Sequence, residues 1–244
     1  MNQKEADWWP AGSRYGTVDL DGARRSLRRG QALVLPTPHP LTGFLVTADP
    51  YVTWKLTGNW MEPLALLVKS FEATLREHVE LDGFARDVAR RLLAFSSLRV
   101  VLPLANGGDH PFWMSPAVRE THVWAQGVPW DAARRLLTGD VPLYCAEARR
   151  PGGRPVTRTR RAILEFPLTV SVLGHRTLYG LDESADPVLD AERSAPTAVA
   201  VTPDGALRLV TSGAHDRHAD DKVRWLSDLG AWCVGEMRQG AFEH

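Results

Sequence analysis

The side chains best suited to acid–base chemistry lie in residues 106–111, which spell Asn-Gly-Gly-Asp-His-Pro. Asp109 and His110 follow an apolar run over 98–104 that predicts a buried strand. Catalytic groups are often carried on loops at strand ends, and histidine titrates near neutral pH. We therefore expect Asp109 and His110 to be catalytic. The alternative is a simple turn in which Asp109 binds backbone N–H groups, because Asn, Gly and Asp are the residues that turns require.

A second histidine, His39, stands between two prolines in the segment 36–40. Proline restricts the backbone, so the His39 imidazole would be presented rigidly, as suits a positioned base. The competing interpretation is an ordinary proline-rich connection between strands. We expect His39 to assist Asp109 and His110 if the fold brings these residues together.

Arginines crowd the segment 149–161, around the turn residues Pro, Gly and Gly at 151–153. Such a pattern predicts an antiparallel hairpin on which Arg158 and Arg160 share one face. A guanidinium can hold a phosphate or carboxylate through two parallel hydrogen bonds. We expect Arg149, Arg158 and Arg160 to bind an anionic part of a substrate. The alternative is a solvated hairpin in an arginine-rich chain.

Nine tryptophans occur in the sequence. Trp113, Trp124 and Trp130 fall in an irregular stretch, where aromatic side chains can line a cleft for an aromatic or acyl ligand. We expect these three to contact substrate. The competing interpretation is a bulky core plus a subunit interface, which leaves a homo-oligomer open.

No metal site is expected. Cys145 and Cys233 lack the paired spacing of zinc ligands, and we expect both in the core. The acidic and histidine-rich residues 215–221 match no zinc or calcium loop, and acidic groups at the start of a helix are explained by capping. No glycine-rich phosphate loop or dinucleotide fingerprint occurs, so the cofactor is left unknown.

Net charge and composition limit the classes of partner that this protein can be expected to bind. The formal net charge is zero, with 44% hydrophobic and 24% charged residues, as in an ordinary globular protein. Without an overall positive field, nucleic acid is a less favoured partner than a small molecule. No run approaches the length of about 18 apolar residues that spans a bilayer. With two cysteines and no leader, the sequence favours a soluble, cytoplasmic protein without a membrane partner.

The pattern along the chain predicts a single α+β domain over 1–244, with an extended or flexible segment at about 1–16. The sheet is expected to be mainly antiparallel with long hairpins, packed against amphipathic helices that include a long C-terminal one. Helices are predicted over 19–30, 61–79, 82–95, 130–139 and from about 216, strands over 31–35, 43–47, 51–56 and 98–104, and hairpins over 141–173 and 198–211.

Together these residues predict a small-molecule enzyme, of the kind found in specialised biosynthesis. It would act on an anionic, aromatic or acyl-type metabolite by histidine and aspartate acid–base chemistry. The alternative is a non-enzymatic binding or regulatory protein that contacts nucleic acid or an acidic partner through the basic hairpin. The sequence does not decide whether the protein is an enzyme.

Overall fold

The computed structural model describes residues 17–37, 41–59, 64–137, 141–167, 169–179 and 193–240. The chain divides into two compact units, each made of two stretches of sequence. Unit 1 contains residues 1–62 and 145–194, and unit 2 contains residues 63–144 and 195–244. The expected single domain stays a prediction, and the predicted N-terminal segment at 1–16 lies outside the described residues.

Unit 1 is built on short strands, of which β1 and β2 are fully buried and β7 and β8 are partly buried. β1 pairs with β2 in antiparallel fashion and with β8 in parallel, while β7 lies on the other side of β2. The strands are β1 (Leu33–Leu35), β2 (Phe44–Thr47), β7 (Tyr144–Glu147) and β8 (Ser171–Val172), and the helices are α1 (Leu20–Arg28), α2 (Pro50–Thr57), α6 (Thr159–Glu165) and α7 (His175–Tyr179).

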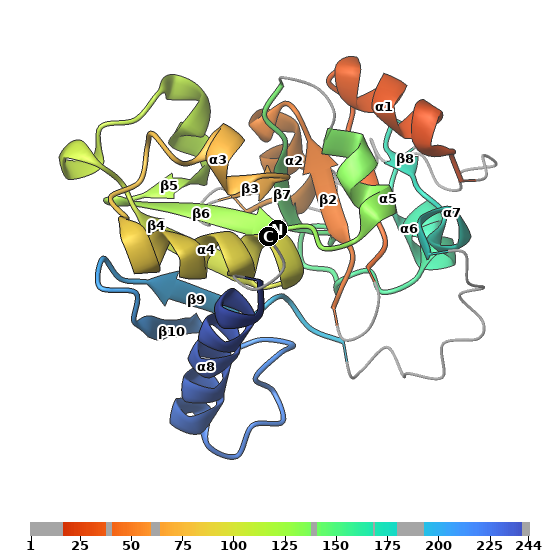
Figure 1. Ribbon diagram of the computed structural model, residues 1–244. Coiled ribbons are helices and arrows are strands. Elements are labelled where there is room, and N and C mark those ends of the chain that lie inside the picture. The colour runs from red at the N-terminus through yellow and green to blue at the C-terminus, as the bar shows by residue number, and fades with distance from the viewer. Residues whose placement is uncertain are drawn as a thin grey trace. The chain divides into compact units, whose positions relative to one another are not determined.

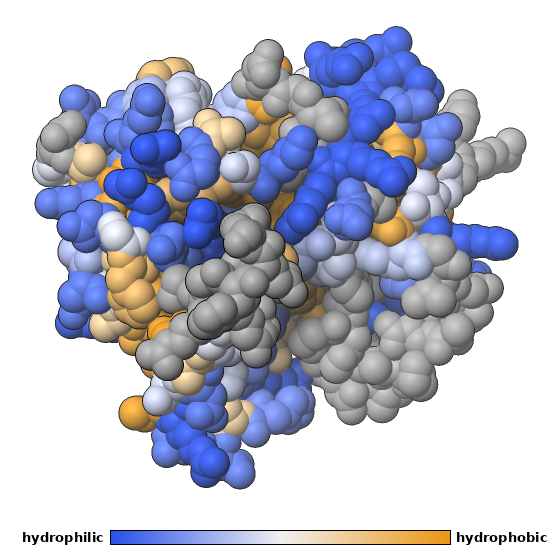
Figure 2. Space-filling view, viewed as in Figure 1, coloured by the Kyte–Doolittle hydropathy of each residue, from blue (hydrophilic) through white to orange (hydrophobic). Residues whose placement is uncertain are grey.

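Helix α1 shows how sequence directs packing in unit 1. The Asp19 side chain accepts a hydrogen bond from Gly22 N–H at 2.6 Å and so caps the helix. Ala23 and Leu27 are buried, and α1 contacts β1 and β8. Its remaining face is hydrophilic, as Figure 2 shows by its blue colour. Amphipathic spacing therefore places α1 on the sheet with its arginines in water.

Unit 2 contains a mixed sheet with the order β10-β9-β4-β6-β3 and with β5 beside β6. Three of its pairs are antiparallel (β4 with β6, β9 with β10, β5 with β6), and two are parallel (β3 with β6, β4 with β9). Its strands are β3 (Ala65–Val68), β4 (Arg99–Pro103), β5 (Val118–Arg119), β6 (His122–Gly127), β9 (Ala198–Val201) and β10 (Leu207–Thr211).

Helices cover the sheet of unit 2. α4 packs on β4, β6 and β9, and α8 lies against α4 and β10 (Figure 1). The helices are α3 (Phe71–Thr74), α4 (Gly83–Phe95), α5 (Asp131–Arg134) and α8 (Lys222–Gly240), with short 3-10 segments η2 (Asn106–Gly108), η3 (Phe112–Ala117) and η4 (Arg135–Leu137). No helix among these is long and apolar enough to cross a bilayer, in the part of the chain that the structure describes.

Several predictions are confirmed. The fold is α+β, a long helix closes the described chain, and β9 and β10 form the expected hairpin. Gly205 N–H donates to Thr202 O at 2.8 Å in that turn, and the φ of Gly205 is +83°. A left-handed backbone of this kind favours glycine, so the turn residues were a reliable signal.

The predicted mainly antiparallel sheet with long hairpins is wrong. The strands are mixed, and the arginine segment forms no hairpin. After β7 the chain turns at Gly152, then enters helix α6 where a returning strand was expected. Thr159, Ala162 and Phe166 are buried at helical spacing, and this spacing outweighs the β-branched residues just before it.

Two further elements were predicted in the wrong class. The strand expected over 51–56 is helix α2, because the Asp49 side chain caps Tyr51 N–H at 3.0 Å and Pro50 occupies the first turn. The helix expected over 61–79 contains strand β3, in which every residue is buried. A short run that is apolar on both faces has no amphipathic period, so it fits either class.

Candidate functional site

Residues 36–43 of unit 1 are here called the proline segment, and distant side chains bind the backbone of residues 36–37 and 41. Arg193, only 7% exposed, donates to Thr37 O at 2.8 Å and to Leu41 O at 3.1 Å. The Tyr179 hydroxyl donates to Pro36 O at 2.8 Å. Burial raises the pKa of Tyr179 despite the nearby charge of Arg193, so the hydroxyl keeps its proton and remains a donor. The proline segment is thus fixed on both sides of residues 38–40.

The same segment is tied to the start of the arginine-rich stretch. Gly43 N–H donates to Val156 O and Ala148 N–H donates to Gly43 O, both at 2.8 Å. The Thr42 hydroxyl donates to Glu147 Oε1, also at 2.8 Å. Arg149 Nη1 lies 4.0 Å from Glu147 Oε2. These bonds place a partly exposed guanidinium and a carboxylate beside the proline segment.

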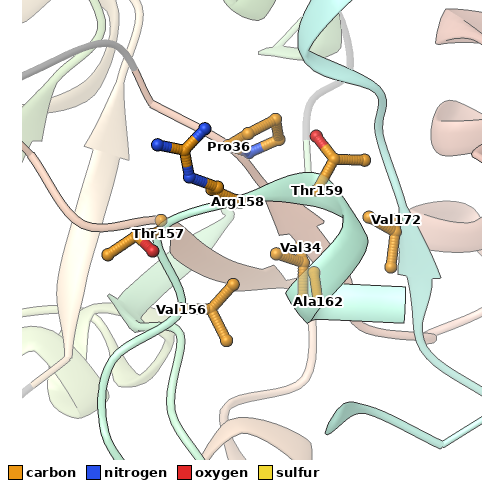
Figure 3. Close-up of a pocket in the computed structure, with 9 residues that line it drawn as sticks. Val34, Pro36, Val156, Thr157, Arg158, Thr159, Ala162 and Val172 are labelled. Carbon is orange, nitrogen blue, oxygen red and sulfur yellow. The ribbon is translucent and has the colours of Figure 1, made fainter. Parts of the chain in front are cut away.

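A small hollow opens where the two segments meet, beneath helix α6 (Figure 3). This α6 hollow has about 170 Å³ of empty space, none of it wide enough for a water molecule. Its lining residues are Val34, Pro36, Gly43, Val156, Thr157, Arg158, Thr159, Ala162 and Val172.

The lining of the α6 hollow includes three polar residues, Thr157, Arg158 and Thr159, although the surface that it exposes is apolar. Arg158 lies beside Pro36, whereas Val34, Val156 and Ala162 form the apolar side (Figure 3). The Thr157 hydroxyl is buried and has no hydrogen-bond partner among the residues that the structure describes. A buried hydroxyl without a partner costs free energy, which a polar ligand group could recover.

The structure brings two of the predicted regions together within unit 1. Arg158 lines the α6 hollow, and Arg149 approaches Glu147 beside the proline segment. Arg160 is exposed and does not line the hollow. His39 lies outside the described residues. The proposed roles of these four residues remain predictions.

Asp109 and His110 lie in unit 2, after β4. The His110 ring is oriented by its own turn, because Nδ1 lies 2.7 Å from Gly108 O and Nε2 lies 3.2 Å from Ser115 Oγ. A proton on Nδ1 satisfies the first contact and lets the Ser115 hydroxyl donate to Nε2. Asp109 is exposed and takes part in neither bond. Their acid–base role also remains a prediction.

The three tryptophans occupy different elements of unit 2. Trp113 belongs to η3, where its ring meets His78 edge-on at 5.7 Å between centroids and its carbonyl accepts a hydrogen bond from the Tyr144 hydroxyl. Trp124 lies on β6, and Trp130 immediately precedes α5. All three are partly buried, and none lines the α6 hollow.

Comparison with solved structures places this arrangement among known folds. The chain superposes on Sua5 of P. abyssi complexed with L-threonine with a TM-score of 0.58 and 15% identity, covering 80% of this chain and 54% of that one. The fold is shared. The structure of E. coli YciO superposes with a TM-score of 0.56 and 15% identity, covering 80% of this chain and 88% of that one. HypF in its phosphate- and nucleotide-bound form superposes with a TM-score of 0.55 and 12% identity, covering 80% of this chain and 29% of that one.

The comparisons extend to fold and no further. This chain spans about half the length of the Sua5 structures that it matches. No protein-family model matches the sequence, and no curated protein is similar enough in sequence to count as a relative.

Sequence reasoning missed several side chains around the α6 hollow. Arg193 follows a polar stretch without periodicity, and Thr42, Glu147 and Thr157 are single polar residues in apolar or basic surroundings. None of them belongs to a local motif. Their shared position depends on contacts between distant parts of the chain.

Proposed function

We propose that unit 1 binds a small molecule through an anionic group, and that Arg158 makes the main contact with that group. The observation that carries the proposal is the meeting of two distant segments at the α6 hollow. There Arg158 follows Thr157, whose buried hydroxyl has no hydrogen-bond partner in the described part of the chain. A guanidinium fork pairs well with a carboxylate or a phosphate.

The solved structures of this fold support the same ligand chemistry. One is complexed with L-threonine, and another holds phosphate and a nucleotide. L-threonine carries a carboxylate, and the other two ligands carry phosphate. We infer that the ligand of this chain carries one of these two groups, and the experiment below separates the two sources.

Binding in the α6 hollow requires a local rearrangement. Its space is too narrow for a water molecule, so a ligand must displace a side chain on entry. Arg158 is the long, partly exposed side chain of the lining, and immobilising it on a bound ligand costs about 0.5–1.5 kcal/mol. We expect Arg158 to swing outward and close over the anionic group, while the apolar side contacts the remainder of the ligand.

Replacing Arg158 with alanine is expected to weaken anion binding about tenfold or more, because the charged donor at the hollow is lost. Isothermal titration of the full chain with L-threonine, inorganic phosphate and ATP identifies which source of the anionic group binds. Arg160→Ala is the matched control, since it removes the same charge from an exposed position two residues further along, in the first turn of α6. We expect the affinity of Arg160→Ala for the anion to stay within about twofold of that of the unaltered protein.

Two results would count against this proposal. If none of the three anions binds, the α6 hollow is not an anion site. If both arginine variants lose affinity equally, only the general positive charge of α6 matters. In that case the nucleic-acid alternative is tested by a mobility-shift titration with RNA at several salt concentrations, because phosphate contacts give binding that weakens steeply with salt.

We also propose a catalytic role for the loop that follows β4. Asp109 and His110 would supply acid–base chemistry with help from His39, as the sequence predicts. The oriented ring of His110 is compatible with that role, because Nε2 accepts from a serine hydroxyl that is itself exposed. Loss of turnover in His110→Ala, with ligand binding retained, is the result expected once titration has identified the ligand.

A further inference from the structure

Unit 2 contains a second and much larger hollow, which is separate from the α6 hollow. This tryptophan groove has about 370 Å³ of space that a water-sized molecule can occupy, whereas the α6 hollow has none. That volume is within the range of pockets that hold small molecules. It is open to solvent and lies between the end of α4, the residues that follow it, and α8. The groove is lined by Phe95, Ser96, Ser97, Leu98, Pro129, His215, Trp225, Leu229 and Trp232.

The walls of the groove are aromatic and apolar. Trp225, Leu229 and Trp232 follow one another at intervals of four and three residues, so they share one face of α8. Trp232 is 37% exposed, and Phe95 at the end of α4 is 61% exposed. Large apolar side chains left accessible around a concavity offer flat contact surfaces to a ring-shaped ligand.

One polar pair lies among these apolar walls. Ser97 Oγ is 2.7 Å from His215 Nε2, and His215 N–H donates to Thr197 Oγ1 at 3.0 Å, which fixes the histidine backbone. His215 Nδ1 is buried without a hydrogen-bond partner in the described part of the chain. Burial lowers the pKa of His215 to about 4, although the adjacent Asp216 opposes the shift. The pair is therefore uncharged near neutral pH.

No side chain that lines the groove is charged under these conditions. The carboxylate of Asp216, which follows His215 in the chain, is fully buried and engaged elsewhere. It accepts hydrogen bonds from Thr197 Oγ1 and Gly213 N–H, both at 2.7 Å, and its second oxygen lies 3.3 Å from Lys222 Nζ. An ionised ligand would lose hydration in this groove without gaining an opposite charge.

We propose that the tryptophan groove binds a planar, uncharged aromatic small molecule whose hydroxyl or ring nitrogen hydrogen-bonds to the Ser97–His215 pair. The rings of Trp225 and Trp232 contact the ligand in a stacked or edge-to-face arrangement, and Phe95, at the end of α4, covers the ligand from that helix. The hydroxyl of Ser97 can donate or accept, so it serves either kind of polar ligand edge.

The Ser97–His215 pair supports binding better than nucleophilic catalysis. A serine nucleophile needs a base whose pKa lies near the working pH, and a third group usually orients that base. The pKa of His215 is about 4, and Asp216 directs its oxygens to Thr197, Gly213 and Lys222 instead of to Nδ1. The histidine is thus a hydrogen-bonding group held neutral.

Naphthol and naphthalenesulfonate test the proposal on the full chain, because they present the same rings with an uncharged or an anionic substituent. We expect titration to show naphthol binding, with quenching of tryptophan fluorescence, and naphthalenesulfonate binding at least about tenfold more weakly. Trp232→Ala is expected to lower the naphthol affinity about tenfold. Val223→Ala, at a position on α8 that is 78% exposed and outside the groove, is the control and should change nothing.

The proposal is overturned if naphthol does not bind, if the sulfonate binds as well as naphthol, or if Trp232→Ala leaves binding unchanged. The first two measurements use the unaltered protein, so they stand even if a variant fails to fold. Sedimentation of the unaltered protein and of Trp232→Ala tests whether a second copy of the chain occupies the groove. If the unaltered protein is a dimer and the variant is a monomer, the groove is a dimer interface and the small-molecule proposal is overturned. Arg158→Ala should leave naphthol binding intact, which separates this site from the α6 hollow.

Discussion

Alanine at position 127 is expected to destabilise the protein severely. A Cβ built on Gly127 would lie 2.4 Å from Leu93 O and 2.8 Å from Ser96 O, closer than real Cβ contacts come. Neither oxygen can retreat easily, because both belong to backbone at the end of α4. We expect Gly127→Ala to lower the free energy of unfolding by about 4 kcal/mol or more, measured by urea denaturation and by the yield of soluble protein.

The surroundings of Gly127 explain why relaxation is limited. Gln126 is fully buried and its amide donates to Ser97 O at 2.9 Å and to Leu98 O at 3.2 Å. These bonds hold β6 against the residues that follow α4. Gly235→Ala is the control, because its Cβ meets nothing within 4 Å, and in a helix it should stabilise by up to about 1 kcal/mol. Normal stability of Gly127→Ala would show that β6 and α4 lie further apart than described.

Asp216→Ala is expected to remove about 3–5 kcal/mol of stability, because it leaves buried donors without an acceptor. The carboxylate is 0% exposed and joins three stretches of unit 2, through Thr197, Gly213 and Lys222. Asp228→Ala is the matched control. That carboxylate is 74% exposed and lies 3.9 Å from Arg224, so its loss should cost less than about 1 kcal/mol. Equal effects of the two substitutions would refute a structural role for Asp216.

Acid should destabilise unit 2 in two stages. Burial alone would raise the pKa of Asp216, but hydrogen bonds from Gly213, Thr197, Ser212 and Lys222 hold it below its ordinary value. The stability that this carboxylate contributes is present above its unfolded pKa and is lost as the pH falls through the folded one.

His215 accounts for the upper stage of that acid response. Its pKa falls from 6.5 to about 4 on folding, so the unfolded chain binds the extra proton and stability declines as the pH drops across this interval. Unfolding free energies measured at a series of pH values should show both stages. Asp216→Ala should retain the decline that begins near pH 6.5 and lose the decline that the carboxylate adds at lower pH.

Local signals predicted the elements of this fold where one residue type is required by backbone chemistry. Asp19 caps α1, and Gly205 takes a left-handed conformation in the β9–β10 turn. Apolar runs were less informative. Residues 65–68 are buried on both faces, so the strand they form has no alternation that distinguishes it from a buried helix.

The sequence predicted individual residues of the candidate site, but it did not predict which of them lie together in space. Composition drew attention to the proline segment and to Arg149 and Arg158, but their neighbourhood depends on the backbone bonds of Gly43 with Ala148 and Val156. Arg193 and the Thr157 hydroxyl gave no signal, because isolated polar residues acquire meaning only through what surrounds them in space. Whether Asp109 and His110 act with the arginines stays a prediction.

The interrupted layout of unit 1 has a consequence for its biosynthesis. Arg193 secures Thr37 from 156 residues further along the chain, and β8, the parallel neighbour of β1, is also translated late. At roughly 5–20 residues per second, a ribosome exposes the nascent β1 and β2 for several seconds before these partners emerge. During that interval the early strands present an unpaired edge, so newly made chains should depend on chaperone protection more than finished ones do.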